Sequence, residues 1–283
     1  MYKRVWINIL LFIVIIILLI IILSEKNKIG EKASSLSIID PNSISTIQIQ
    51  RKNLSSILFN KIDDKWKINS PVQIQANPIR IKSILNILTA ESHKKLNLNE
   101  IDITQFDLRS PKVILKLDQN NFHFGTTNPI DQRRYVLFDE TIHLIDDYLF
   151  SQLMVNVYFF ADNKLLADNE DIKSIDFPDY KIYKNNGQWV STKKDYDEEK
   201  IKNIVMTWEN LIAAKVEEYQ LNDGSYKKDC AYRKSCNPAI SIETSSGEKI
   251  SFSIEKEKPN LILGREPIYV QYIIMPDDVI QMF

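Results

Sequence analysis

Glycine is scarce in this chain, with six residues among 283. The six do not cluster, so the sequence lacks a glycine-rich loop of the kind that holds a phosphate with backbone N–H groups. The G-x-S-x-G turn that presents a nucleophilic serine is missing too. We therefore predict no catalytic residue and no cofactor, and we expect a protein that is not an enzyme.

Histidine is nearly as rare, with three residues in the chain. His93 follows a predicted helix in a surface-like setting, whereas His123 and His143 fall in predicted strands of one unit. Two histidines on neighbouring strands can share a metal, but no cysteine or carboxylate stands at a ligand spacing from them. We predict ordinary sheet residues and no metal site.

An excess of charge of one sign is also missing, because 36 Lys and Arg oppose 37 Asp and Glu. Nucleic-acid binding ordinarily needs a basic face, so we predict no nucleic-acid partner. One local basic group, residues 132–135 (QRRY), has two interpretations. It can contact a phosphate or lipid head group, but a charged strand rim is the commoner arrangement.

The one long apolar run lies at the N-terminus, at residues 5–23, where Asn8 is the only polar side chain. A helix of this length, at 1.5 Å per residue, spans roughly the 30 Å hydrocarbon core of a bilayer. The run is longer than the apolar core of a signal peptide, and neither a cleavage motif nor a lipoprotein cysteine follows it. We predict an uncleaved single-pass membrane anchor, then a polar linker at residues 24–42.

The orientation of the anchor rests on a weak asymmetry. Residues 1–4 include two basic side chains, and three lysines follow the apolar run, so the positive charges on the two sides are nearly equal. A short basic N-terminus before a long apolar run usually stays in the cytoplasm. We predict that residues 1–4 form a cytoplasmic tail and that the main domain lies outside the cytoplasm.

The rest of the chain repeats one pattern, at residues 43–153 and again at 165–283, with a joint at 154–164. Each unit has alternating strands, one main helix with an apolar stripe, four more strands and a short final helix. Asn77 and Asp197 are predicted to cap the two main helices. The predicted fold class is α+β, with an N-terminal transmembrane helix followed by two tandem modules of antiparallel sheet and helix.

Shared residues mark the repeat. Trp66 corresponds to Trp189, and the Asp-Asp pair at residues 146–147 corresponds to the pair at 277–278. The two tryptophans either line a ligand groove or anchor the cores. We predict structural anchors, because each stands near a strand end just before the main helix.

The joint is rich in aromatic residues. Tyr158, Phe159 and Phe160 follow one another in it. We predict that these side chains pack between the two modules.

Three segments carry a family resemblance: KWKINSPVQIQANPIRIKSIL (residues 65–85), FDLRSPKVILKL (106–117) and FHFGTT with RRYVLFDETIHLIDD (122–147). In this order they resemble the domain-of-unknown-function 4340 family, over nearly the whole chain after the linker. The resemblance implies a bacterial inner-membrane protein with one N-terminal helix and a repeated α+β region in the periplasm. In the second unit, YKKDCAYRKSCNP (226–238) replaces the compact FDLRSP.

Two functions of different classes follow. The first is a non-enzymatic adaptor or accessory protein whose partner is an inner-membrane or envelope protein. Some members of the family stand beside ABC-type transport systems of the gliding-auxiliary kind, which implies a transporter subunit as that partner. The alternative is an envelope module that binds or senses a small ligand, lipid or glycan through a pocket between the modules.

The only two cysteines, Cys230 and Cys236, lie in a polar insertion that the first module lacks. An even pair in an exposed loop is typical of a disulfide formed in an oxidising compartment, and an incidental reduced pair is the alternative. A zinc site would need two further ligands, and none lies nearby in sequence. We predict the disulfide.

Overall fold

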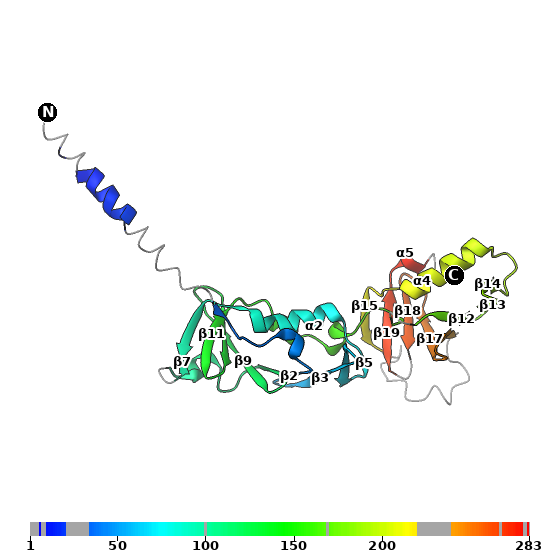
Figure 1. The fold of residues 1–283 in the computed structure, drawn as a ribbon, viewed down its shortest axis with the longest axis horizontal. Coiled ribbons are helices and arrows are strands. Elements are labelled where there is room, and N and C mark those ends of the chain that lie inside the picture. Colours follow the sequence, from blue (N-terminus) through cyan, green and yellow to red (C-terminus); the bar gives the residue numbers. More distant parts are fainter. Residues whose placement is uncertain are drawn as a thin grey trace.

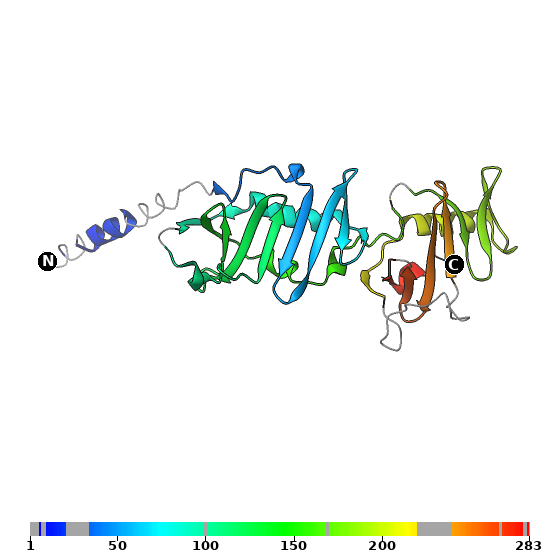
Figure 2. The same ribbon diagram turned by 90° about the horizontal axis from the view of Figure 1, so that it is seen from below.

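The computed structural model describes residue 6 and residues 10–20, 34–98, 101–167, 170–219, 239–265, 268–279 and 282. The fold is α+β, with antiparallel sheets and a few helices, as predicted. Two large sheets lie one after the other along the molecule, as Figures 1 and 2 show. A small additional sheet pairs β1 (Ser34–Ser35) with β6 (Glu91–Ser92).

The first large sheet has nine strands among the described residues. In spatial order these strands are β5 (Ile74–Gln75), β4 (Lys65–Ser70), β3 (Leu54–Ile62), β2 (Thr46–Arg51), β8 (Val113–Leu117), β9 (Asn120–Thr127), β10 (Arg134–Phe138), β11 (Thr141–Ile145) and β7 (Lys94–Asn97). Neighbouring strands are antiparallel throughout.

The second large sheet has eight strands in the part of the chain that the structure describes. In spatial order these are β14 (Gln188–Ser191), β13 (Lys181–Asn185), β12 (Ile172–Asp176), β16 (Ala239–Thr244), β17 (Lys249–Lys256), β18 (Leu261–Arg265), β19 (Val270–Ile274) and β15 (Lys215–Glu218). Except for the extra strand β5, the order matches that of the first sheet, strand for strand, when both are numbered along their own units.

The two sheets also share a hairpin. Between β3 and β4, Asp63 and Asp64 both have positive φ, and between β13 and β14 Asn186 and Gly187 do. Positive φ at both central residues is the geometry of a tight two-residue hairpin turn. In each hairpin the tryptophan is the second residue after the turn: Trp66 pairs with Lys61, and Trp189 with Lys184. Both tryptophans are half-buried and pack against the core.

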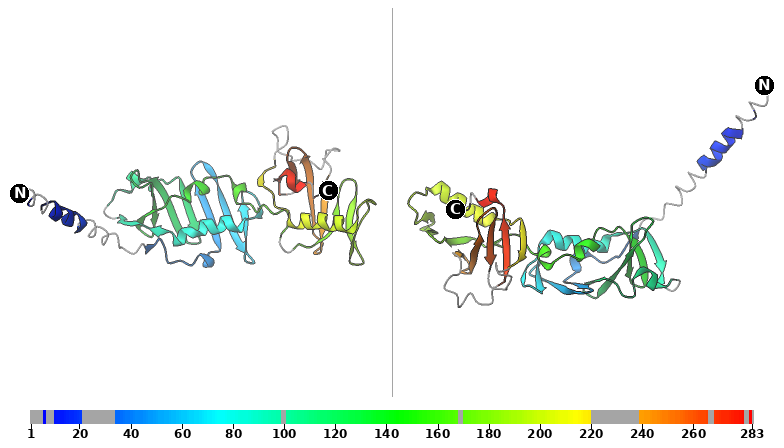
Figure 3. Two further views of the ribbon diagram at one scale, coloured as in Figure 1. Left: turned by 90° about the horizontal axis from the view of Figure 1, so that it is seen from above. Right: turned by 180° about the vertical axis from the view of Figure 1, so that it is seen from behind.

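One main helix covers a face of each sheet. Helix α2 (Pro78–Leu85) and helix α4 (Glu198–Asn210) lie on the same side of the two sheets, in front of the strands in the left view of Figure 3. Asn77 Oδ1 accepts hydrogen bonds from the N–H groups of Ile79 and Arg80, and Asp197 Oδ1 accepts one from Lys200. Both predicted caps are therefore confirmed, and each satisfies helix N–H groups that have no partner within the helix.

The buried stripes of the helices follow the predicted spacing. The stripes comprise Ile81, Ile84 and Leu85 in α2, and Ile201, Ile204, Val205 and Trp208 in α4. The remaining short helices are η1 (Pro41–Ser43), η2 (Asn86–Thr89), η4 (Ile103–Phe106), α3 (Phe150–Leu153), η5 (Val157–Phe160) and α5 (Pro276–Val279).

The strand ends correct one of the residue correspondences, that of the Asp-Asp pairs. The Asp-Asp pairs stand one and two residues after Ile145, the end of β11, but three and four residues after Ile274, the end of β19. Across β9–β10 His123 pairs with Leu137, and across β10–β11 His143 pairs with Val136. The same steps in β17–β19 lead to Ser253 and Tyr272, so neither histidine has a histidine counterpart in the second sheet.

The structure describes residues 6 and 10–20 of the apolar run, and residues 10–20 are helical. Within the described residues, no helix is long and apolar enough to cross a membrane. Cys230 and Cys236 lie outside the described residues. The membrane anchor and the disulfide therefore stay predictions.

Candidate functional site: the groove at the joint

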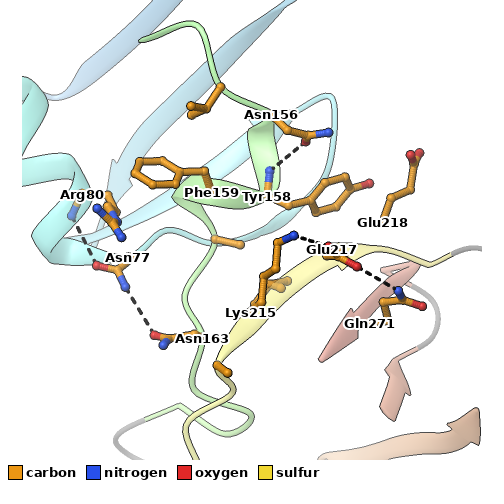
Figure 4. Close-up of a pocket in the computed structure, with 14 residues that line it drawn as sticks. Asn77, Arg80, Asn156, Tyr158, Phe159, Asn163, Lys215, Glu217, Glu218 and Gln271 are labelled. Carbon is orange, nitrogen blue, oxygen red and sulfur yellow. Dashed lines mark hydrogen bonds and ion pairs between the residues drawn. The ribbon is translucent and has the colours of Figure 1, made fainter. Parts of the chain in front are cut away.

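A groove of about 610 Å³ lies where the two modules meet (Figure 4). Its first wall comes from the start of α2 and from η5, and its second wall from β15 and its neighbour β19. Helix η5 belongs to the joint, and residues of the joint on both sides of it also line the groove. The lining residues are Asn77, Arg80, Val155, Asn156, Tyr158, Phe159, Ala161, Asn163, Ala214, Lys215, Val216, Glu217, Glu218 and Gln271.

The joint is held to the first module by backbone hydrogen bonds. Asn77 N–H donates to the Phe160 carbonyl at 2.8 Å, and Asp162 N–H donates to the Gln75 carbonyl at 2.8 Å. The Phe160 ring is buried and meets Phe59 edge-on, with 5.4 Å between centroids. Phe160 thus packs into the first core, whereas Tyr158 and Phe159 line the groove.

The joint is held to the second module in the same way. Ala213 N–H donates to the Asn163 carbonyl at 2.8 Å, and Asn163 Nδ2 donates to the Ala213 carbonyl at 3.0 Å. Just after the joint, Arg265 Nη1 donates to the Leu165 carbonyl at 3.2 Å. Hydrogen bonds therefore tie the joint to both modules that form the groove.

The first wall presents a cation above an aromatic ring. The Arg80 guanidinium lies 4.0 Å from the centroid of Phe159. Asn156 caps η5, because its Oδ1 accepts a hydrogen bond of 3.1 Å from the Tyr158 N–H. The Asn77 amide, besides capping α2, donates from Nδ2 to Asn163 Oδ1 at 3.4 Å.

The second wall presents carboxylates. Lys215 pairs with Glu217, and Gln271 Nε2 donates to Glu217 Oε2 at 3.3 Å. The hydrogen bond from Lys215 lowers the pKa of the Glu217 carboxyl below its ordinary value. Glu218, the last residue of β15, is half-buried and has no ion pair with any described residue.

The tryptophans and cysteines that the sequence analysis singles out are not part of the groove. Trp66 and Trp189 stand on hairpins outside the groove, and Cys230 and Cys236 lie outside the described residues. The groove residues themselves give no sequence signal, apart from the helix cap Asn77 and the aromatic pair of the joint. The walls come from four separate stretches of chain, and only the fold brings them together.

The histidines do not form a site together. Leu137 and Val136 are adjacent in β10, so their side chains point to opposite faces of the sheet. His123 pairs with Leu137 and His143 with Val136, so the two histidines also point to opposite faces. They stand on β9 and β11 with β10 between them, so the shared-metal arrangement weighed from the sequence does not arise.

His143 is buried inside the first module. Its Nδ1 lies 2.9 Å from the Ser92 hydroxyl, and the residue is 3 % exposed. Burial, with a smaller contribution from nearby Lys95, lowers the pKa of His143 to about 4. His93 is also largely enclosed rather than surface-like, with Glu91 at 3.3 Å and Asp146 at 3.0 Å from its ring nitrogens.

The depressed pKa of His143 predicts a pH-dependent stability. Between pH 6.5 and about 4 the unfolded chain binds a proton that the folded chain rejects, so the free energy of unfolding falls as pH drops through this window. The contribution is fully present above pH 6.5 and amounts to roughly 3 kcal/mol. Urea unfolding of the wild type and of His143→Gln at several pH values measures it. Parallel curves for the two chains across the window would contradict this assignment.

Searches of the curated proteins and of the solved structures found no match to this chain. A family model does match, over residues 66–229, and its description is Domain of unknown function (DUF4340). The match covers more than half of the chain and both walls of the groove except Gln271. The chain belongs to this family of domains of unknown function.

Proposed function

We propose that this chain is a membrane-anchored, envelope-facing, non-enzymatic adaptor that binds another membrane or envelope protein. The observation that carries the proposal is the groove at the joint, whose walls come from different modules and present both charges. A partner segment in this groove contacts both modules at once. A subunit of an ABC-type transport system is the partner that the family resemblance suggests.

The matching strand order of the two sheets supports a second part of the proposal, that the modules are copies of one ancestral unit. The shared turn geometry and the matching places of Trp66 and Trp189 agree with it. The joint between the copies is then the one surface that neither copy has alone. A function that the single ancestral unit lacked would therefore be located at this joint.

A sensor of a small envelope ligand is the second candidate. The groove volume of about 610 Å³ supports it, because sites for small molecules usually measure about 300–1,000 Å³ and often lie between domains. Purification of the full chain from membranes in mild detergent separates the candidates. A stoichiometric membrane protein in the eluate is the result expected of the adaptor, and a retained small molecule without a protein partner would favour the sensor.

The cysteine pair tests the proposed topology. In the periplasm Cys230 and Cys236 are expected to form a disulfide, and the short loop that it closes gives a modest stabilisation of about 2 kcal/mol. Alkylation of intact cells with and without reductant measures the state of both thiols. Full labelling of both thiols without reductant would show that no disulfide forms and would argue against the periplasmic location.

A further inference from the structure

Four polar groups in the groove have no hydrogen-bond or ion-pair partner among the residues that the structure describes. They are the Arg80 guanidinium, Asn156 Nδ2, the Glu218 carboxylate and Gln271 Oε1. The Arg80 guanidinium lies over the face of the Phe159 ring. Glu218 and Gln271 are half-buried, so each has lost part of its contact with water and can be stabilised by a hydrogen-bonding partner.

The orientation of both amides is set by the bonds that they make. Asn156 Oδ1 accepts from a backbone N–H, so its Nδ2 donor is left for the groove. Gln271 Nε2 donates to the Glu217 carboxylate, so its Oε1 acceptor is left for the groove. If the Asn156 amide were flipped, its Nδ2 donor would face the Tyr158 N–H donor. If the Gln271 amide were flipped, its Oε1 acceptor would face the Glu217 carboxylate.

The unpartnered groups are sorted by the wall of the groove on which they lie. The first wall, from α2 and the joint, offers donors, the Arg80 cation and the Asn156 amide, and the second wall, from β15 and β19, offers acceptors, Glu218 and Gln271. Figure 4 shows Arg80 and Asn156 on the side of α2 and η5, and Glu218 and Gln271 on the side of β15 and β19. A ligand that satisfies both walls carries an anionic group on one side and a cationic group on the other.

We propose that the groove binds an extended peptide segment of the partner protein in which an acidic and a basic residue are adjacent. Successive side chains of an extended chain point to opposite sides. The acidic side chain then reaches Arg80 and Asn156, and the basic one reaches Glu218 and Gln271, through charge-assisted hydrogen bonds. This inference rests on the proposed adaptor function.

The shape of the groove favours a peptide over a free amino acid. Ligand sites usually bury most of the surface of their ligand, and a single amino acid leaves most of about 610 Å³ empty. The rings of Tyr158 and Phe159 lie between the two charged walls (Figure 4). Such rings accommodate the apolar stems of long charged side chains.

The test uses the full chain in mild detergent and capped hexapeptides of valine and threonine with a central charged pair. Peptides with a mixed pair, glutamate–lysine or lysine–glutamate, are expected to bind about tenfold more tightly than peptides with two glutamates or two lysines. Arg80→Glu and Glu218→Lys are each expected to weaken binding of the better mixed peptide by about tenfold. Isothermal titration calorimetry measures all of these affinities.

Matched controls lie on the same modules outside the groove. Lys82→Glu on α2 and Glu209→Lys on α4 change exposed charges and are expected to leave binding unchanged. No binding of any mixed peptide, or equal losses in the controls, overturns the proposal. Free glutamate or lysine that binds as tightly as the mixed hexapeptide assigns the groove to a small ligand and overturns it too.

The failure of this inference is distinguishable from that of the adaptor function. If wild type and Arg80→Glu retain the same stoichiometric membrane protein, the adaptor function stands and the groove is not its docking site. If the wild type retains no protein partner, the adaptor function itself fails.

Discussion

Replacement of Arg134 by alanine is expected to lower the free energy of unfolding of the first module by about 3–5 kcal/mol. Arg134 is 9 % exposed, and its Nε and Nη2 each donate to the Asp147 carboxylate at 2.7 Å. Its Nη1 donates to the Gly125 carbonyl, and its guanidinium lies 3.7 Å from the centroid of Phe150. The alanine variant leaves the partly buried Asp147 carboxylate with one long hydrogen bond, from Thr127 Oγ1 at 3.4 Å, and removes the side-chain donor to the Gly125 carbonyl.

The neighbouring residue provides the control. Arg133 contacts Asp131 and Asp146 at 3.5 Å each from a more exposed position, so Arg133→Ala is expected to cost less than about 1 kcal/mol. Urea unfolding of the full chain, followed by tryptophan fluorescence, measures both variants. A double change, Arg134→Met with Asp147→Leu, removes the stranded charge and is expected to recover part of the loss. Equal effects of the two single variants would contradict the role of Arg134.

The ion pair of Arg134 could not be predicted from the sequence. The QRRY segment reads as a charged strand rim, and the first arginine behaves in that way. The second arginine points into the module, because Asp147 follows β11 and meets it there. Nothing in the local pattern identifies this partner, since the pairing depends on the β10–β11 register. In the second sheet Leu261 pairs with Ile274, as Arg134 pairs with Ile145 in the first sheet. An apolar side chain thus fills the position that Arg134 fills in the first module.

Several strands that face the core could be predicted, because they bury alternate residues, as β2 and β8 do. Two edge strands, β7 and β15, could not. Each follows the main helix of its unit and pairs on one side only, with β11 or β19. Their residues are mostly charged, as is common in edge strands that must not attract another chain, so no apolar alternation marks them. β15 supplies one wall of the groove, and the groove could not be predicted without it.

Replacement of Trp208 by alanine is expected to lower the free energy of unfolding of the second module by about 3–5 kcal/mol. Trp208 is fully buried on α4, meets Phe177 edge-on at 6.0 Å and lies 6.1 Å from Phe252 between ring centroids. Its Nε1 donates to the Met282 carbonyl at 3.1 Å. The variant opens a cavity between helix and sheet and removes the bond that holds residue 282 to α4.

The other tryptophan of this module is the matched control, because Trp189→Ala removes the same side chain from a half-buried hairpin position. The cost of that change is expected to be clearly smaller, about 1–2 kcal/mol, since the area withdrawn from water is smaller. Trp208→Phe keeps most of the ring volume and loses the hydrogen bond, so its loss of stability should lie between those of Trp189→Ala and Trp208→Ala. Urea unfolding of the three variants, followed by circular dichroism to avoid the loss of a fluorophore, gives the order. If Trp189→Ala destabilises as much as Trp208→Ala, the hairpin rather than the helix anchors this module.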